Sequence, residues 1–251
     1  MKRFVFTVSI SLVAFAVAAA IVYSRAQQGI ALYLGTNGWT LKRDIIFTFP
    51  NGESRRIGRD VKYFAADGHR RDVSYHIKDD GTETCENVVV YIPGRGAFYE
   101  NSRDQRLVYI EDYTGWGGYV DINLAHKDPN YVSDQQVLSY NCAFTRNVAS
   151  GGTITEYYEG YNFARFPLKK VTRSNKGIQT WEPTAIELGE VPESALAYQN
   201  EWLVDFGEFE ERIQRTQSAN PSDPQYTQQA ERLRQQLKEA KRRLSKQYEK
   251  P

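Results

Sequence analysis

Short extended segments separated by tight-turn residues dominate residues 44–188 and most constrain the fold. Asn51-Gly52 and Asp67-Gly68 each follow a β-branched or aromatic run. Such pairs favour two-residue hairpins because both positions tolerate positive φ. Residues 73–78 alternate apolar and polar side chains, which is the period of a half-buried strand. No stretch of crossover-helix length separates the runs, so the sequence predicts an antiparallel meander and not a parallel sheet.

The strand pattern can be placed along the chain. Residues 88–92 are apolar throughout, so we expect a central strand covered on both faces. Residues 134–140 fit either a short helix or a strand. The full set of predicted strands is 44–49, 61–66, 73–78, 88–92, 107–110, 120–124, 153–158, 162–172, 178–181 and 184–188.

The pattern changes near Pro192 from strands to helices. Apolar residues with helical spacing first occur at Trp202, Phe206, Phe209 and Ile213, and a second stripe repeats every four and three residues from 226 to 248. The second stripe is narrow, like the seam of a coiled coil. Ser222 and Gln225 fit a capping box at the start of the second helix.

Charge supports pairing of these two helices. Residues 201–215 carry a net charge of −3, whereas residues 231–250 carry +5. A short connection and opposite charge favour an antiparallel helical hairpin. The alternative is a loose C-terminal helix with a solvated basic face.

These patterns predict an α+β fold that is mainly β. We expect a curved antiparallel sheet, arranged as a half-barrel or meander, at residues 27–192. The helical hairpin follows at residues 193–251.

Residues 1–26 have the character of an export segment. Two cations precede an uncharged apolar run from Phe4 to Tyr23, and Ser24-Arg25-Ala26 fits a signal-peptidase site. The run is also long enough to span a bilayer, so the segment is either a cleaved signal peptide or a retained anchor. Both alternatives place the rest of the chain outside the cytoplasm, as a periplasmic or secreted protein. The membrane is then contacted only through residues 4–23, if they are retained.

Two cysteines, Cys85 and Cys142, lie in the exported part. In an oxidising compartment the simplest interpretation is one disulfide, which would stabilise the fold by roughly 4 kcal/mol in the chain-entropy model. The alternative is two buried free thiols.

Catalytic and metal-binding patterns are not recognisable in the sequence. The three histidines are scattered, and no nucleophile elbow, phosphate loop, zinc-protease motif or C-x-x-C pair occurs. The sequence therefore predicts no catalytic residue, no metal and no cofactor. Many acidic side chains in the β region leave a hydrolase open, because that chemistry depends on a separation that only coordinates give.

Charge and aromatic residues narrow the choice of ligand. Removing the three cations of residues 1–26 changes the formal net charge from +1 to −2, which disfavours a nucleic-acid partner. Trp39, Trp116 and Trp181 are candidate ligand-binding residues that could line a concave face for an apolar ligand or for sugar rings. The alternative is that they are core residues and cross-strand pairs.

The order of the elements resembles the periplasmic lipoprotein-carrier half-barrels of the LolA/LolB-like superfamily. The similar segments are Gly58–Phe64, Asp67–Arg71, Val88–Ile92, Ala97–Tyr99, Leu107–Tyr109, Glu159–Tyr161 and Gly189–Pro192. The resemblance implies a curved antiparallel sheet that holds acyl chains against covering helices. Residues 27–39 lack the helix that precedes the first strand in that family, and helices at the C-terminus would be a departure from it.

We therefore predict an extracytoplasmic, non-enzymatic binding protein whose β domain contacts an apolar or envelope-derived ligand, such as a lipid. The alternative is an envelope assembly module that binds a protein partner, or a second copy, through its C-terminal helices. A hydrolase is the third possibility.

Overall fold

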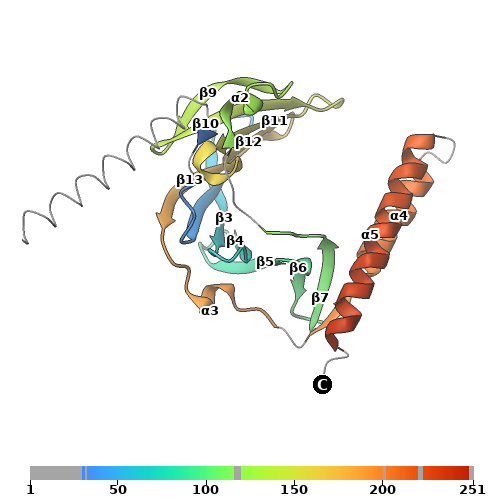
Figure 1. Cartoon of the computed structure of the whole chain (residues 1–251). Helices are drawn as coiled ribbons and strands as arrows, with labels where there is room; N and C mark the ends of the chain where they lie inside the picture. The colour runs from blue at the N-terminus through green and yellow to red at the C-terminus, as the bar shows by residue number, and fades with distance from the viewer. Residues whose placement is uncertain (1–29, 32, 116–119, 200–201, 220–222, 249–251) are drawn as a thin grey trace, which may run out of the picture. The chain divides into compact units, whose positions relative to one another are not determined.

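The computed structural model describes residues 30, 31, 33–115, 120–199, 202–219 and 223–248. Within these residues the chain is mainly β, with an open, mostly antiparallel twelve-stranded sheet and helices at its C-terminal end (Figure 1). The predicted fold class is confirmed. The predicted export segment lies outside the described residues. No described helix combines the length and the apolar character needed to span a bilayer.

The chain divides into two compact units. Unit 1 comprises residues 1–36, 47–54 and 117–183, and unit 2 comprises residues 37–46, 55–116 and 184–251. Three long strands contribute residues to both units. The C-terminal helices belong to unit 2 and share a core with its strands. That the β domain ends at residue 192 and the helical hairpin after it is a separate domain stays a prediction.

Unit 2 is a meander that ends in a short parallel strand. Neighbouring strands follow chain order from β2 to β7, and β14 then pairs in parallel with β7. The strands are β2 (Trp39–Thr48), β3 (Ser54–Phe64), β4 (Arg70–Ile77), β5 (Glu83–Ile92), β6 (Gly96–Asn101), β7 (Arg106–Glu111) and β14 (Leu203–Asp205). The predicted turn at Asp67-Gly68 forms, with Gly68 at φ 92°, but it is not the predicted two-residue turn, because three residues lie between Ala65 and His69, where Ala65 N donates to His69 O at 2.8 Å.

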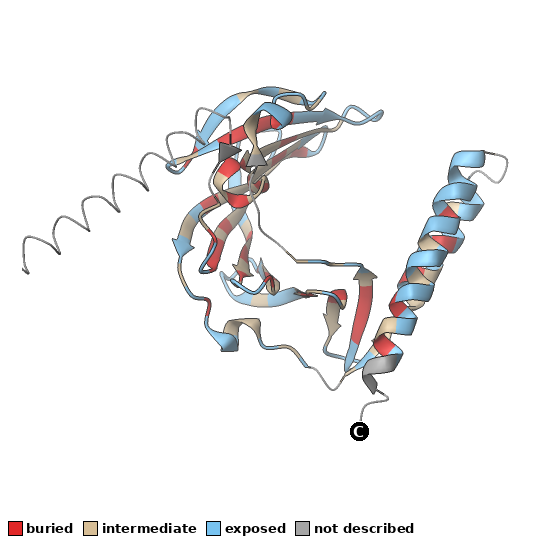
Figure 2. Ribbon diagram, in the orientation of Figure 1, coloured by how far each residue is buried: buried red, intermediate tan, exposed pale blue. Residues whose placement is uncertain are grey.

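The helical hairpin packs on one end of this sheet. Helices α4 (Gly207–Ala219) and α5 (Pro224–Tyr248) contact each other, and α4 also contacts β7 (Figure 1). Lys241 and Glu210 form an ion pair of 2.6 Å between the two helices. Buried positions recur along both helices (Figure 2), and the two apolar stripes join side chains of β5, β6 and β7 in one core. The predicted antiparallel hairpin is confirmed.

The hairpin differs from the prediction at both helix starts. Trp202 and Phe206 precede α4, because the intervening residues form β14 along the edge of β7. At the start of α5 the capping oxygen belongs to Asp223, whose Oδ1 accepts from Gln225 N at 2.9 Å. Ser222, the predicted cap, lies outside the described residues.

A buried ionic network crosses the first strands of unit 2. Asp72 accepts from Lys62 Nζ at 2.7 Å and from Arg70 Nε at 2.7 Å. Asp60 is bound by Arg43 through two hydrogen bonds, and Lys62 lies 3.4 Å from Asp60. The side chains of the network are at most 12% exposed. Each buried charge therefore has an opposite partner, as a low-dielectric site requires.

Unit 1 is a second antiparallel meander. Its strands β9 (Tyr131–Val137), β10 (Tyr140–Val148), β11 (Ile154–Gly160), β12 (Phe166–Ser174) and β13 (Gly177–Leu188) pair in chain order. A two-stranded ladder of β1 (Ile30–Ala31) and β8 (Val120–Asp121) precedes the helix α2 (Ile122–Ala125). A 3₁₀ turn, η1 (Tyr161–Phe163), connects β11 to β12.

The structure corrects four of the predicted strands. Residues 120–124 start as β8 but turn into α2 because Asp121 Oδ1 caps the backbone N–H of Asn123 at 2.8 Å. Residues 162–172 are interrupted, since Ala164 and Arg165 adopt positive φ. The two strands predicted at 178–188 form one strand, β13. The ambiguous residues 134–140 are extended through Val137.

Candidate functional site

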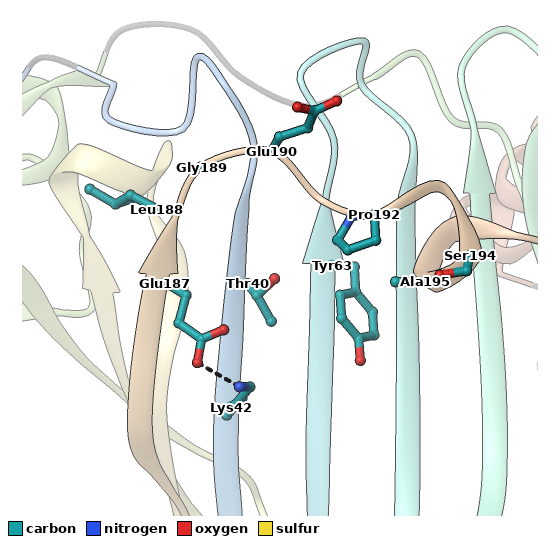
Figure 3. A pocket seen from close by; sticks show the side chains of 10 residues that line it. All are labelled: Thr40, Lys42, Tyr63, Glu187, Leu188, Gly189, Glu190, Pro192, Ser194 and Ala195. Carbon is teal, nitrogen blue, oxygen red and sulfur yellow. Dashed lines mark hydrogen bonds and ion pairs between the residues drawn. The ribbon is translucent and has the colours of Figure 1, made fainter.

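A groove in unit 2 is the candidate site. Its volume is about 490 Å³, and its lining comes from β2, β3, the end of β13 and the segment that includes the short helix α3 (Glu193–Leu196) (Figure 3). Thr40 and Lys42 project from β2, Tyr63 from β3, and Glu187 from β13. These side chains come from parts of the chain up to 147 residues apart, and the sheet places them next to one another.

One end of the groove depends on a close backbone approach. Gly189 N donates to Gly38 O at 3.0 Å, which joins the start of β2 to the end of β13. Gly38 has φ +91°, and a Cβ there would lie 2.9 Å from the carbonyl oxygens of both Gly189 and Phe64. Only glycine fits both the conformation and the space. The segment that forms the groove wall thus leaves the sheet at a fixed point.

The wall itself is held by Arg71. Its guanidinium donates to the carbonyl oxygen of Ala197 and pairs with Glu100 at 3.2 Å. Arg71 is the cross-strand partner of Tyr63 in the β3–β4 ladder, so the wall is fixed next to the tyrosine. Burial raises the pKa of Glu100, and the charge of Arg71 only partly offsets this effect.

The groove presents charge, hydroxyls and one aromatic ring. Lys42 Nζ lies 2.5 Å from a carboxylate oxygen of Glu187, and these side chains are 38% and 57% exposed. Tyr63 is half-buried beside them, while Glu190 points away from the ion pair (Figure 3). Lysine donates hydrogen bonds and the carboxylate accepts them. This arrangement suits the binding of a polar ligand.

A second polar cluster lies in unit 1. Asp134 Oδ1 accepts from Tyr161 at 2.5 Å and lies 3.1 Å from His126 Nε2. Burial and the bond to Asp134 raise the pKa of Tyr161, so its hydroxyl stays protonated. Burial by itself raises the pKa of Asp134, but the bonds from Tyr161 and His126 outweigh it and hold the pKa below its ordinary value. The cluster fastens the end of α2 to β9 and supplies no activated nucleophile.

The structure places the predicted tryptophans in different environments. Trp39 is fully buried in unit 2, where its ring stacks on Phe64 with centroids 3.9 Å apart. Trp181 is half-buried in unit 1, and Lys170 Nζ lies 4.5 Å from its ring centroid. Trp116 lies outside the described residues. Of these residues, only Trp181 is shown with surface that a ligand could reach.

The structure holds both cysteines as free thiols, one in each unit, and the disulfide between them stays a prediction. Cys85 is exposed on β5. Cys142 is fully buried within unit 1, where its thiol donates to Tyr140 O at 3.5 Å. Burial raises the pKa of Cys142 to about 12, which keeps it as an unreactive thiol.

Sequence reasoning did not identify the groove residues. Lys42 and Glu187 are ordinary polar positions of two strands, and no local pattern links them. Their meeting depends on β2 and β13 being neighbours in the sheet. In the described part of the chain, no group of three or more histidine, cysteine, aspartate or glutamate side chains is arranged to hold a metal ion.

Comparison with known proteins gives distant likenesses only. No protein-family model and no curated protein matches the chain. The chain is similar to the crystal structure of a LolA superfamily protein from Nitrosomonas europaea, with 5% sequence identity and a TM-score of 0.34, over 66% of this chain and 93% of that one. It is also similar to a domain named as an outer membrane lipoprotein-sorting protein from Vibrio parahaemolyticus, with 9% identity and a TM-score of 0.25, over 70% and 94% of the two chains. The fold therefore rests on the strand pairing described above.

Proposed function

We propose that this chain is an extracytoplasmic, non-enzymatic binding protein whose unit 2 groove takes a polar, hydroxyl-rich ligand of the cell envelope, such as an oligosaccharide. The observation that carries the proposal is the Lys42–Glu187 ion pair beside the ring of Tyr63 in one groove. A volume of about 490 Å³ lies within the range of small-ligand pockets, roughly 300–1,000 Å³. The extracytoplasmic location rests on the export character of residues 1–26.

The chemistry of the groove favours sugars over acyl chains. Each sugar hydroxyl both donates and accepts, so it matches an ammonium and a carboxylate that lie side by side. The half-buried ring of Tyr63 offers an apolar surface with a polar end. An acyl chain would desolvate the ion pair without replacing its bonds to water, which is unfavourable.

The apolar face of the sheet supports the same choice. Val90, Phe98 and Tyr109 would be natural contacts for an acyl chain on β5, β6 and β7, but α4 and α5 already cover them. In this chain the helices complete the core. Lipid carriage, which the family resemblance implied, therefore has less support than a polar ligand.

The alternative of an assembly module that acts through the helical hairpin also has less support. Ala230, Ala240 and Leu244 of the predicted seam are buried in the core of unit 2. A partner helix that used the same stripe would have to displace α4, which packs against α5.

The test compares two probe classes on the exported protein by isothermal titration calorimetry. One is a panel of neutral and N-acetylated oligosaccharides, and the other is a dansyl-labelled fatty acid. We expect saturable binding of at least one oligosaccharide, weakened roughly 10- to 150-fold by Lys42→Ala, because a hydrogen bond to a charged group contributes about 1.5–3 kcal/mol. Tyr63→Ala should also weaken it, whereas Lys176→Ala, in an exposed turn, should not.

Two results would contradict the proposal. One is saturable binding of the fatty acid with no oligosaccharide bound. The other is oligosaccharide binding that Lys42→Ala and Tyr63→Ala leave unchanged, which would place the ligand elsewhere on the chain.

A further inference from the structure

Strand β9 forms an exposed edge of the unit 1 sheet. It pairs with β10 on one side, and no strand of the described residues pairs with it on the other. Six of its seven residues are exposed or half-buried; only Val137 is buried. An edge of this length leaves a row of backbone donors and acceptors open to another strand.

The sequence of β9 lacks the usual protection of an edge. Proteins commonly blunt edges with lysine, proline or inward-pointing charges. Tyr131–Val137 contains neither lysine nor proline, and its one charged residue is Asp134. A bulge opposite Phe144 and Thr145 affects only the beginning of the strand. Residues 133–137 therefore form a regular edge.

The geometry of the β9–β10 hairpin fixes which backbone groups face outward. Val137 and Tyr140 are paired across a two-residue turn. The closing pair of such a hairpin exchanges both of its backbone hydrogen bonds, and the direction then alternates along the strand. The N–H and C=O groups of Asp134 and Gln136 therefore point away from β10.

We propose that β9 is a self-association surface, which pairs antiparallel with β9 of a second copy of this chain. Residues whose backbone groups point outward can hydrogen-bond only to residues of the second strand whose backbone groups also point outward. The two strands can therefore be displaced relative to each other only in steps of two residues. With Gln135 opposite Gln135 of the second copy, Asp134 lies opposite Gln136 twice, by symmetry.

The side chains at this register complement each other. Within the described residues, the side-chain hydrogen bonds to Asp134, from Tyr161, Tyr131 and His126, all use Oδ1. Oδ2 can thus accept from a glutamine amide across the new interface. Gln136 donates one amide hydrogen to Asn141 at 3.1 Å and retains a second.

The neighbouring register toward the start of β9 is less favourable. It would place Asp134 opposite Asp134 of the second copy, and like charges directly opposite destabilise a strand pair. The charge of Asp134 thus selects between the registers, and it makes Gln136 the position at which the proposal can be tested.

The experiment is sedimentation velocity of the exported protein over a range of concentrations, with opposite charges placed at Gln136. We expect a reversible dimer. Gln136→Lys, which meets Asp134 twice, should tighten it roughly 2- to 30-fold, and Gln136→Glu should weaken it by a similar factor, since each pair contributes about 0.2–1 kcal/mol. Gln228→Lys and Gln228→Glu, at an exposed position of α5, are the matched controls and should leave the dimer unchanged.

A protein that sediments as a monomer at every concentration would overturn the proposal. It would also be overturned by a dimer whose dissociation constant moves in the same direction, or not at all, in the two Gln136 variants. Circular dichroism of both variants verifies that the exposed substitution leaves the fold intact.

Discussion

Replacing Asp72 by asparagine tests the buried ionic network of unit 2. The Asp72 side chain is 10% exposed and is bound by Lys62 and Arg70, whose side chains are 12% and 11% exposed. Removing one partner of a buried ion pair costs about 3–5 kcal/mol, because the remaining charges lose their compensation. Asparagine keeps one acceptor oxygen, so we expect Asp72→Asn to lower the free energy of unfolding by about 3 kcal/mol. For a chain of this size that lowers Tm by roughly 6–12 °C.

The same substitution has a defined pH dependence. Burial by itself raises the pKa of Asp72, but the charges of Lys62 and Arg70 outweigh burial and hold the pKa below its ordinary value of 3.8. A carboxyl whose pKa is lowered by folding stabilises the protein above its unfolded pKa, and this contribution is lost as the pH falls through the folded pKa. The difference between the wild type and Asp72→Asn should thus be complete at pH 7 and should shrink below about pH 4.

Urea unfolding followed by circular dichroism at pH 7 and at pH 3 measures both quantities. Asp79→Asn is the matched control, since Asp79 also pairs with an arginine but its side chain is 92% exposed. We expect its unfolding midpoint to equal that of the wild type. If Asp72→Asn unfolds within 0.5 kcal/mol of the wild type at pH 7, a magnitude typical of surface substitutions, the reasoning from burial is refuted.

Three further predictions concern packing, backbone and thiols. Leu244→Ala removes a side chain that is 2% exposed in the hairpin core, so we expect the free energy of unfolding, measured in urea, to fall by about 2–5 kcal/mol. A decrease below about 1 kcal/mol would contradict the packing of α5. Gly38→Ala should lower Tm more than Gly52→Ala, because both glycines have positive φ but only the Cβ at 38 meets backbone oxygens at 2.9 Å; equal losses would show that the close approach is absent. In the native protein a thiol reagent should modify Cys85 and leave Cys142 unmodified until unfolding. Protection of both cysteines would indicate that they form the disulfide predicted from the sequence.

The sequence by itself determined the local elements of this chain. Asn51-Gly52 and Asp67-Gly68 predicted turns that the structure forms, with both glycines at positive φ. Glycine and the residues before it carry this information locally, because the turn depends on backbone conformation alone. The apolar stripe that includes Leu237 and Leu244 likewise predicted a helix with one buried face. These patterns depend only on residues that are neighbours in the chain.

Only the tertiary structure decided which elements meet and what their side chains then contact. Lys42 and Glu187 form an ion pair because β2 and β13 are neighbours in the sheet, and nothing in either strand indicates the other. Cys142 is a buried thiol because the core of unit 1 encloses it. For Trp39 the sequence left a ligand contact and a core position open, and the structure stacks its ring on Phe64 inside unit 2. Such contacts follow from long-range strand pairing, whose register is set by the whole pattern of burial and by no short motif.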